Sequence, residues 1–507
     1  MTSSILGLAA TALGFMASFL YGIVLTPYLV RHLDIDVYGL LPLSFALVAY
    51  FGILTQTIGA SLNARLVASH RDADAFNGVF TISLSLSSCV GVVVFLVGWI
   101  ASPHLSRVVD IPAGHDSDAQ AIFLATLAAL AMSLIVVPFH GVLFAASKIY
   151  LIASIQALQT VARAILIVLL FGLFSASMEA VAAAIVASAA LSMLSSAIAA
   201  FAARGSLAFR PSGFRLSIVV ELLQTSGGVL MTQIGTLLIF NVDLLLVNHL
   251  AGASESARYA AAAQWAVALR GLAVGVAGVF SPAIMKLYSG RQNRDALATF
   301  VRSVSTYCGA SIALPAGFLA GAGPELLGVW IGPDVASCWQ VTALSSLGAV
   351  ICATAVPAWT VSLAANKVYL PGVVTLSTGG LVIVGGLLSS LLPVPLAAGV
   401  AGAVVVAQLC QTMFFTMPYA ARNATQRPTA FLSPVARSFG YFVISAGLSL
   451  VAVGLARPEN FLQLTACGVL IAPFYCMIVF LSMPRDDRGR MTRNAGAVAE
   501  KLRAVLT

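Results

Sequence analysis

Two arginines lie far from any loop, in the middle of long apolar runs. Arg163 is near the centre of the run 149–172, and Arg270 is near the centre of the run 257–285. An ionised side chain among apolar neighbours is costly to desolvate, so such residues usually face a cavity or a partner. The planar guanidinium, with its five N–H donors, suits carboxylate and phosphate oxygens. A phosphate or pyrophosphate ligand is therefore one hypothesis for this pair.

Neutral amides accompany the arginines. Gln156, Gln159 and Arg163 are spaced i, i+3 and i+7, so they share one face if the run is helical. Gln233 and Asn241 are eight residues apart and also share a face. We predict a substrate-binding cavity whose candidate residues are the polar side chains within the apolar runs: Arg270, Arg163, Gln159, Gln156, Gln233, Asn241, Gln56 and Asn63.

The same side chains could instead hold helices together. Arg163 and Arg270 could pair with Asp243 or with the glutamines and only pack the protein. Asp243 lies toward one end of its run, and it could be a structural partner or could bind a coupling ion. His140 is opposite Trp359 in an internal repeat described below, which favours a packing role for His140.

The sequence carries no motif for catalysis. It has no Walker loop, HExxH motif, nucleophile elbow or pair of cysteines with metal-ligand spacing. The seven cysteines occur singly in or beside apolar runs, where they resemble small apolar residues. We therefore expect no enzyme activity, no cofactor and no metal. Any transport would draw on an ion gradient, the membrane potential or removal of the product.

Composition identifies the elements that must position these residues. The 507 residues are 60% apolar and 9% charged, with a mean hydropathy of +0.99, whereas a soluble domain is about 45–50% apolar and about 25% charged. About 20 apolar residues are enough for one helix to cross a bilayer. Fourteen runs reach that length: 5–30, 38–61, 79–101, 121–145, 149–172, 179–203, 218–246, 257–285, 297–322, 338–364, 368–391, 396–420, 435–455 and 461–483.

These runs predict an all-α polytopic membrane protein with about 14 transmembrane helices. Membrane-exposed backbone must satisfy its own hydrogen bonds, which favours helices, and the runs lack the alternation of barrel strands. The first run has no basic leader, so we expect it to remain a helix rather than act as a signal peptide. With both termini in the cytoplasm, only four of the 26 Lys and Arg residues fall in outer loops. We therefore attribute the net charge of +8 to topology and anionic lipid, not to nucleic acid.

An internal repeat organises the helices. Val137–Leu151 recurs as Val356–Leu370 without a gap, with eight of fifteen positions identical, including Pro, Lys and Tyr. Helices one to six thus repeat as seven to twelve, and an even number of spans makes the copies parallel. We predict an N-lobe over 1–203, a C-lobe over 218–420, two further helices over 435–483 and a basic cytoplasmic tail over 484–507. Two such lobes commonly rock about a central cleft.

Several segments resemble a known family. Tyr28–Leu40 resembles the family motif in which a hydrophobic–x–Arg–x–Leu–Gly run leads into a Tyr-Gly start of helix two, although Asp34 replaces the usual Gly. Ser281–Leu287, followed by a basic loop and Asp295–Leu297, is also similar. Together with twelve repeated helices plus two, the chain resembles the polysaccharide transporter branch of the multidrug/oligosaccharidyl-lipid/polysaccharide exporter superfamily.

This resemblance implies a flippase. Such proteins are thought to move an undecaprenyl-pyrophosphate-linked oligosaccharide to the outer leaflet of the bacterial inner membrane, and Arg270 would then engage the pyrophosphate or acidic sugars. The implied partners are lipid-linked oligosaccharide and membrane lipids, with a glycan polymerase and export machinery as further candidates. We expect a monomer. Helix one has no basic residue in its interior, unlike the lipid II flippases, which disfavours a peptidoglycan precursor.

Three other functions stay open. A cation-coupled drug antiporter would share the fold but would be expected to place carboxylates deep in the lobes. A glycan polymerase would be expected to carry a long, charged outer loop. A non-transporting scaffold of a glycan assembly complex would tolerate the loss of Arg270.

Overall fold

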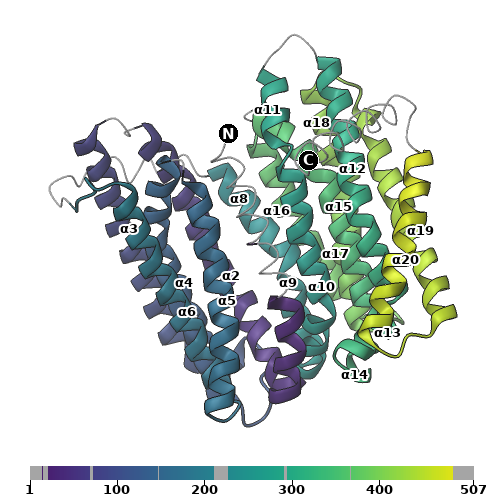
Figure 1. The fold of residues 1–507 in the computed structure, drawn as a ribbon, viewed down its shortest axis with the longest axis horizontal. Helices are drawn as coiled ribbons and strands as arrows, with labels where there is room; N and C mark the ends of the chain where they lie inside the picture. Colours follow the sequence, from purple (N-terminus) through teal and green to yellow (C-terminus); the bar gives the residue numbers. More distant parts are fainter. Residues whose placement is uncertain are drawn as a thin grey trace, which may run out of the picture. The chain divides into compact units, whose positions relative to one another are not determined.

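The protein is an all-α polytopic membrane protein (Figure 1). Its structure is a computed structural model that describes residues 14, 21–68, 72–146, 148–209, 227–289, 294–365 and 367–482. Within those ranges, 13 helices are long and apolar enough to cross a membrane, and no β-strand occurs. Most of the expected first helix, 5–30, and the whole expected tail, 484–507, lie outside the described residues. Of the first helix, residues 14 and 21–30 are described and are helical.

The chain divides into two compact units. The first comprises residues 1–268 and 367–411, and the second comprises residues 269–366 and 412–507. The expected N-lobe lies within the first unit, whereas the residues of the expected C-lobe are shared between both. The division into two six-helix lobes stays a prediction.

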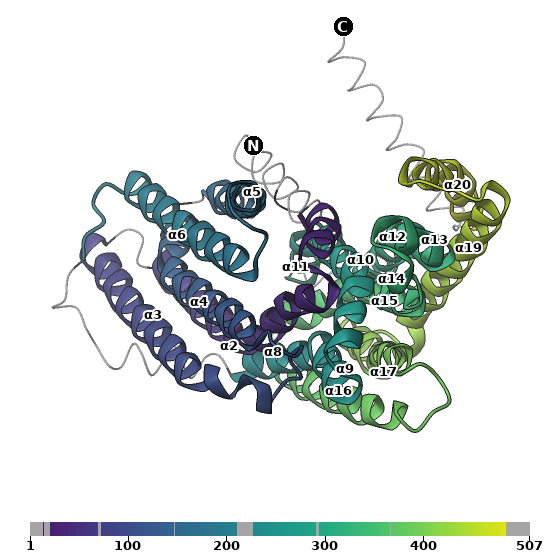
Figure 2. The ribbon, with the colours of Figure 1, turned by 90° about the horizontal axis from the view of Figure 1, so that it is seen from below.

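The first unit is built around α4. This helix packs against α2, α3 and α6, and α5 packs against α6 (Figure 2). Helix starts are stabilised locally: Asp72 caps α3 by accepting from the Asp74 and Ala75 N–H groups, and Ser177 caps α6. The helices that begin in this unit are α2 (Ile35–Ala68), α3 (Ala73–Ala101), η1 (Ser102–Arg107), α4 (Asp116–Ala145), α5 (Ile149–Leu173), α6 (Met178–Ala203), α8 (Gly227–Phe240), α9 (Val242–Ala251), α10 (Ala253–Gly278), α16 (Tyr369–Ser389), α17 (Leu396–Cys410) and η3 (Gln411–Thr416).

The second unit is held by close contact between α12 and α19. Two glycines of α12 pack against serines of α19: Gly309 contacts Ser438, and Gly317 contacts Ser445. Ser445 also donates to the Leu314 carbonyl at 2.8 Å. Small residues let membrane helices approach closely enough for such bonds. The helices that begin in this unit are α11 (Ser281–Ser289), α12 (Arg294–Gly321), α13 (Gly323–Trp330), α14 (Pro333–Ala336), α15 (Trp339–Ala364), α18 (Met417–Asn423), η4 (Pro428–Phe431), α19 (Leu432–Ala456) and α20 (Phe461–Ser482).

Three expected single helices are interrupted. The run 218–246 breaks at Asn241, whose φ of −134° ends α8 before α9 begins. The run 257–285 divides into α10 and α11, and the run 396–420 contains the π-helical stretch Gln411–Thr416. A hydropathy average over a whole run does not mark these breaks, because single polar residues such as Asn241 and Gln411 lie within otherwise apolar runs.

The repeated segment makes the same turn in both copies. The residue that follows α4, Ala146, has φ −79° and ψ 3°, and the residue that follows α15, Ala365, has φ −77° and ψ −5°. Each of these N–H groups bonds to the carbonyl four residues earlier, Val142 or Val361. The sequence similarity therefore corresponds to a shared local structure.

Candidate functional site

A neutral polar cavity lies between α2, α4, α5 and α6 in the first unit. Its volume is about 250 Å³. No lining residue carries a carboxylate, an ammonium or a guanidinium group. We call it the glutamine cavity, and its lining residues are Thr55, Ala129, Ser133, Val136, Val137, His140, Gln156, Gln159, Ala189 and Ser192.

Much of the polar lining is available to a ligand. The side-chain amides of Gln156 and Gln159 have no hydrogen-bond partner among the described residues. Thr55 and Ser133 each donate to a carbonyl of their own helix, at 2.6 and 2.7 Å, and keep acceptor lone pairs. His140 bonds to the Ser196 hydroxyl at 3.1 Å through Nε2. The cavity thus offers amide donors together with amide and hydroxyl acceptors, a set that suits a ligand rich in hydroxyl groups.

Arg163 lies one turn beyond Gln159 on α5, outside the glutamine cavity. Its Nε donates to the Ser188 hydroxyl of α6 at 3.2 Å. Its guanidinium carbon is 6.0 Å from the centre of the Tyr21 ring. Arg163 forms no ion pair with a carboxylate in the described part of the chain, so it does not pair there with Asp243.

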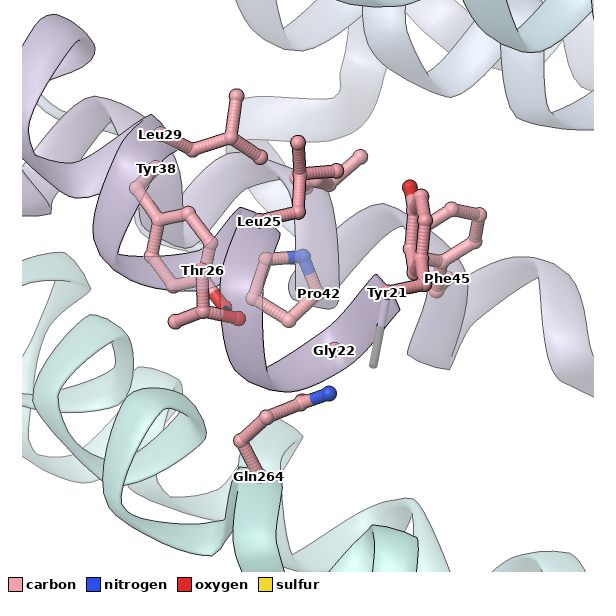
Figure 3. Close-up of a pocket in the computed structure, with 10 residues that line it drawn as sticks. Tyr21, Gly22, Leu25, Thr26, Leu29, Tyr38, Pro42, Phe45 and Gln264 are labelled. Atoms are coloured by element: carbon pink, nitrogen blue, oxygen red, sulfur yellow. Dashed lines mark hydrogen bonds between the residues drawn. The ribbon is translucent and has the colours of Figure 1, made fainter. Parts of the chain in front are cut away.

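A second cavity lies between residues 21–33, α2 and α10 in the first unit, with a volume of about 210 Å³ (Figure 3). Figure 3 shows Gln264 reaching from α10 toward Gly22. A Cβ on Gly22 would collide with the amide of Gln264, so the glycine makes room for this amide. Thr26 and Tyr38 hydroxyls are 3.4 Å apart. We call it the tyrosine pocket, and its lining residues are Tyr21, Gly22, Leu25, Thr26, Leu29, Tyr38, Leu41, Pro42, Phe45 and Gln264.

The remaining predicted residues lie elsewhere. Asp243 is nearly buried and accepts from the Tyr259 hydroxyl at 2.7 Å and from the Leu244 N–H at 2.9 Å. Whether Asp243 is only a structural partner or also binds a coupling ion stays a prediction. Gln233 is on α8, and Asn241 is at the break between α8 and α9.

Two candidates cannot be placed at either cavity, and one lies in the other unit. Gln56 and Asn63 are on α2, but their side chains lie outside what the structure describes. Arg270 is half-buried on α10, in the second unit. Of the predicted set, the structure therefore brings together Gln156 and Gln159, with Arg163 one turn away.

The tyrosine pocket was not predicted from the sequence. Gln264 is a lone amide within a run of alanines and apolar residues, and this is the same signal that singled out Gln156. Tyr21 and Phe45 gave no such signal, because aromatic residues are common in membrane helices.

Comparison with known proteins now identifies the family. Residues 6–288 match the family described as polysaccharide biosynthesis protein, which is more than half of the chain. The chain belongs to this family. The chain is also 25% identical over 506 residues to the uncharacterized membrane protein EpsK of Bacillus subtilis (strain 168), covering 97% of this chain and 98% of that protein.

Several solved structures share the fold of this chain. The lipid II flippase MurJ in an inward closed conformation gives a TM-score of 0.70 at 13% identity, covering 94% of this chain and 98% of that chain. An inward-facing multidrug resistance MATE family transporter of the MOP superfamily gives 0.64 at 14% identity, covering 86% and 98%. The resemblance predicted from the sequence motifs is confirmed.

Proposed function

We propose that this protein translocates an undecaprenyl-pyrophosphate-linked oligosaccharide across the bacterial inner membrane by alternating access, for polysaccharide biosynthesis or export. The observation that carries the proposal is the glutamine cavity, which is neutral and rich in amides and hydroxyls inside a membrane bundle. A sugar presents many hydroxyl groups, each both a donor and an acceptor. Two unpartnered glutamine amides can bind such groups, whereas an apolar lipid chain cannot use them.

Membership of the polysaccharide biosynthesis protein family supports a glycan cargo. The fold shared with MurJ supports movement across the bilayer rather than chemistry on the glycan. In this proposal both termini are cytoplasmic, and Arg163 and Arg270 attract the anionic pyrophosphate. A drug antiporter has the MATE fold in its favour, but the glutamine cavity lacks the carboxylate that a cationic drug or coupling ion would need.

The proposal is tested in a deletion strain with radiolabelled lipid-linked oligosaccharide, scoring its accessibility on the outer leaflet of spheroplasts. We expect label to accumulate inaccessible to external reagents in the deletion strain. Replacing both amides (Gln156→Leu with Gln159→Leu) should slow the appearance of accessible label by roughly tenfold or more, since each lost hydrogen bond costs about 0.5–1.5 kcal/mol. Thr160→Val is the matched control, because Thr160 is on the same helix and bonds to the Gln156 carbonyl rather than to the cavity.

Two outcomes contradict the proposal. Normal accessibility in the deletion strain would exclude a flippase. Full complementation by an Arg270→Ala protein that also carries both leucine substitutions would favour a scaffold, because a scaffold needs no binding cavity.

A further inference from the structure

The tyrosine pocket combines apolar walls with polar groups. Aromatic side chains come from two different segments: Tyr21 precedes α2 in the chain, and Tyr38 and Phe45 belong to α2. Hydroxyl groups of Thr26 and Tyr38 meet on one side, and the Gln264 amide enters from α10 (Figure 3). No lining residue is charged.

The Gln264 amide is the strongest indication of a ligand. It has no hydrogen-bond partner among the described residues. Gln264 is half-buried and its amide lines the pocket, so the amide can bond to water or to a ligand that enters. At about 30 Å³ per liquid water, the pocket of about 210 Å³ holds at least about seven waters, so it has room for one sugar ring.

The chemistry of the lining selects among occupants. A pyranose ring has faces of C–H groups, which pack on aromatic rings, and edges of hydroxyl groups, which bond to amides and hydroxyls. An isoprenoid chain would leave the Gln264 amide unsatisfied. A cation would find no carboxylate in the lining, and the guanidinium of Arg163 lies against the Tyr21 ring without lining the pocket itself.

The two cavities share no lining residue. Phe45 in the tyrosine pocket and Thr55 in the glutamine cavity are ten residues apart on α2, which is roughly 15 Å along a helix. Arg163 is near a lining residue of each cavity. It is one helical turn from Gln159 of the glutamine cavity, and its guanidinium is next to the ring of Tyr21 of the tyrosine pocket.

We propose that the tyrosine pocket is a second sugar subsite, which binds one neutral monosaccharide unit of the glycan through stacking on aromatic rings and hydrogen bonds to Gln264. The inference rests on the proposed function, because it places a second part of the same cargo. One sugar unit occupies the glutamine cavity while another occupies the tyrosine pocket.

The test uses the full chain in lipid nanodiscs and saturation-transfer difference NMR with methyl glucoside, methyl galactoside and methyl N-acetylglucosaminide as probes. All measurements are made in the background that carries both Gln156→Leu and Gln159→Leu, so that only the tyrosine pocket can bind. We expect at least one glycoside to receive saturation at its ring C–H protons. Gln264→Leu keeps the size of the side chain and removes the amide, and it should raise the apparent dissociation constant roughly three- to tenfold.

A second variant changes the pocket without touching the amide residue. In Gly22→Ala the new Cβ displaces the Gln264 amide, while alanine favours the helix. It should reproduce the loss seen with Gln264→Leu. Gly78→Ala is the control, because a Cβ there meets nothing within 4 Å.

Three results would overturn the subsite: no saturation transfer in the double-leucine background, binding unchanged by Gln264→Leu, or equal binding in Gly22→Ala and Gly78→Ala proteins. The spheroplast assay judges the proposed function separately. If Gln264→Leu flips normally while the glutamine-cavity variant does not, the subsite fails and the flippase stands. If the deletion strain itself flips normally, the flippase fails whatever the NMR shows.

Discussion

At the scale of single residues, Asp34 explains a departure from the family motif. It occupies the position where the family usually has glycine, and its φ is +63°. Only glycine adopts this left-handed region without cost, but aspartate and asparagine tolerate it better than other residues. The backbone carbonyl of Asp34 accepts the Tyr38 N–H at 3.0 Å, which is the first helical bond of α2. The motif therefore encodes a turn geometry rather than a chemical group.

A stability measurement tests this reading of Asp34. Asp34→Gly should be nearly neutral, whereas Asp34→Val should destabilise by about 1–2 kcal/mol, because a β-branched residue is strained at this φ. The midpoint of thermal unfolding in detergent measures both. Asp116→Val is the control, since it removes an acid from the first turn of α4 without a positive φ. Equal losses at the two positions would show that charge, not backbone geometry, matters.

Residue chemistry also limits what could be predicted about the site. Gln156, Gln159 and Arg163 were found because polar groups are costly in apolar runs, and their spacing placed them on one face. The residues on other helices that these groups contact could not be predicted in this way. That Arg163 bonds to Ser188, and that Gln264 approaches Gly22, depends on which helices are neighbours.

At the scale of elements, the two helices beyond the repeat are structural parts of the second unit. The Tyr475 hydroxyl of α20 donates to the Ala310 carbonyl of α12 at 2.6 Å. α19 places Ser438 and Ser445 against glycines of α12. These contacts bind both helices to one repeat helix, so we interpret helices thirteen and fourteen as a brace for α12.

Replacing one glycine of α12 by valine tests the close packing of α12 against α19. In Gly317→Val the new side chain would meet Ser445 and lie 2.7 Å from the Phe442 carbonyl oxygen. Overpacking of this kind should lower the free energy of unfolding by roughly 1–3 kcal/mol. The readout is the temperature at which the protein aggregates in fluorescence-detected size-exclusion chromatography. Gly447→Val on α19 is the matched control, because its Cβ has open space, and equal effects of the two variants would contradict the close packing.

Prediction at the element scale worked where apolar length decides the outcome. The described spans overlap the expected ones, since a bilayer requires a minimum run of apolar residues. It failed where a backbone torsion or a π-helical turn interrupts such a run, at Asn241 and at Gln411–Thr416. These interruptions depend on packing that hydropathy does not encode.

At the scale of the whole molecule, transport by alternating access needs contacts that close one side and can break. One candidate joins the segment after η1 to the last turn of α9 and the first residue of α10, all in the first unit. Asn248 is fully buried; it accepts from the Asp110 N–H at 2.7 Å and donates to the Asp110 carbonyl at 3.0 Å. The Asp110 carboxylate accepts from the Ala253 N–H at 3.1 Å. We call this set of bonds the Asp110–Asn248 clamp.

The clamp connects the two copies predicted from the repeat, because residue 110 belongs to the first copy and residue 248 to the second. With the predicted topology, both segments lie on the outer side of the membrane. In the proposed alternating-access mechanism, outward opening separates these segments and breaks these bonds, so that their strength sets part of the balance between closed and open states.

Asn248→Ala should shift that balance toward outward opening. The substitution removes two bonds to the Asp110 backbone, and a difference of about 1.4 kcal/mol changes a two-state ratio tenfold. A cysteine reporter in the tyrosine pocket, Thr26→Cys, is placed in a protein whose seven native cysteines are replaced by serine. It should then react several-fold faster with a membrane-impermeant maleimide added from outside, relative to the same reporter with Asn248 intact. His249→Ala is the control, because His249 is adjacent and exposed. Equal rates in the two backgrounds would show that the clamp does not hold the outer side closed, while a faster rate for Asn248→Ala alone would assign it to the outer gate.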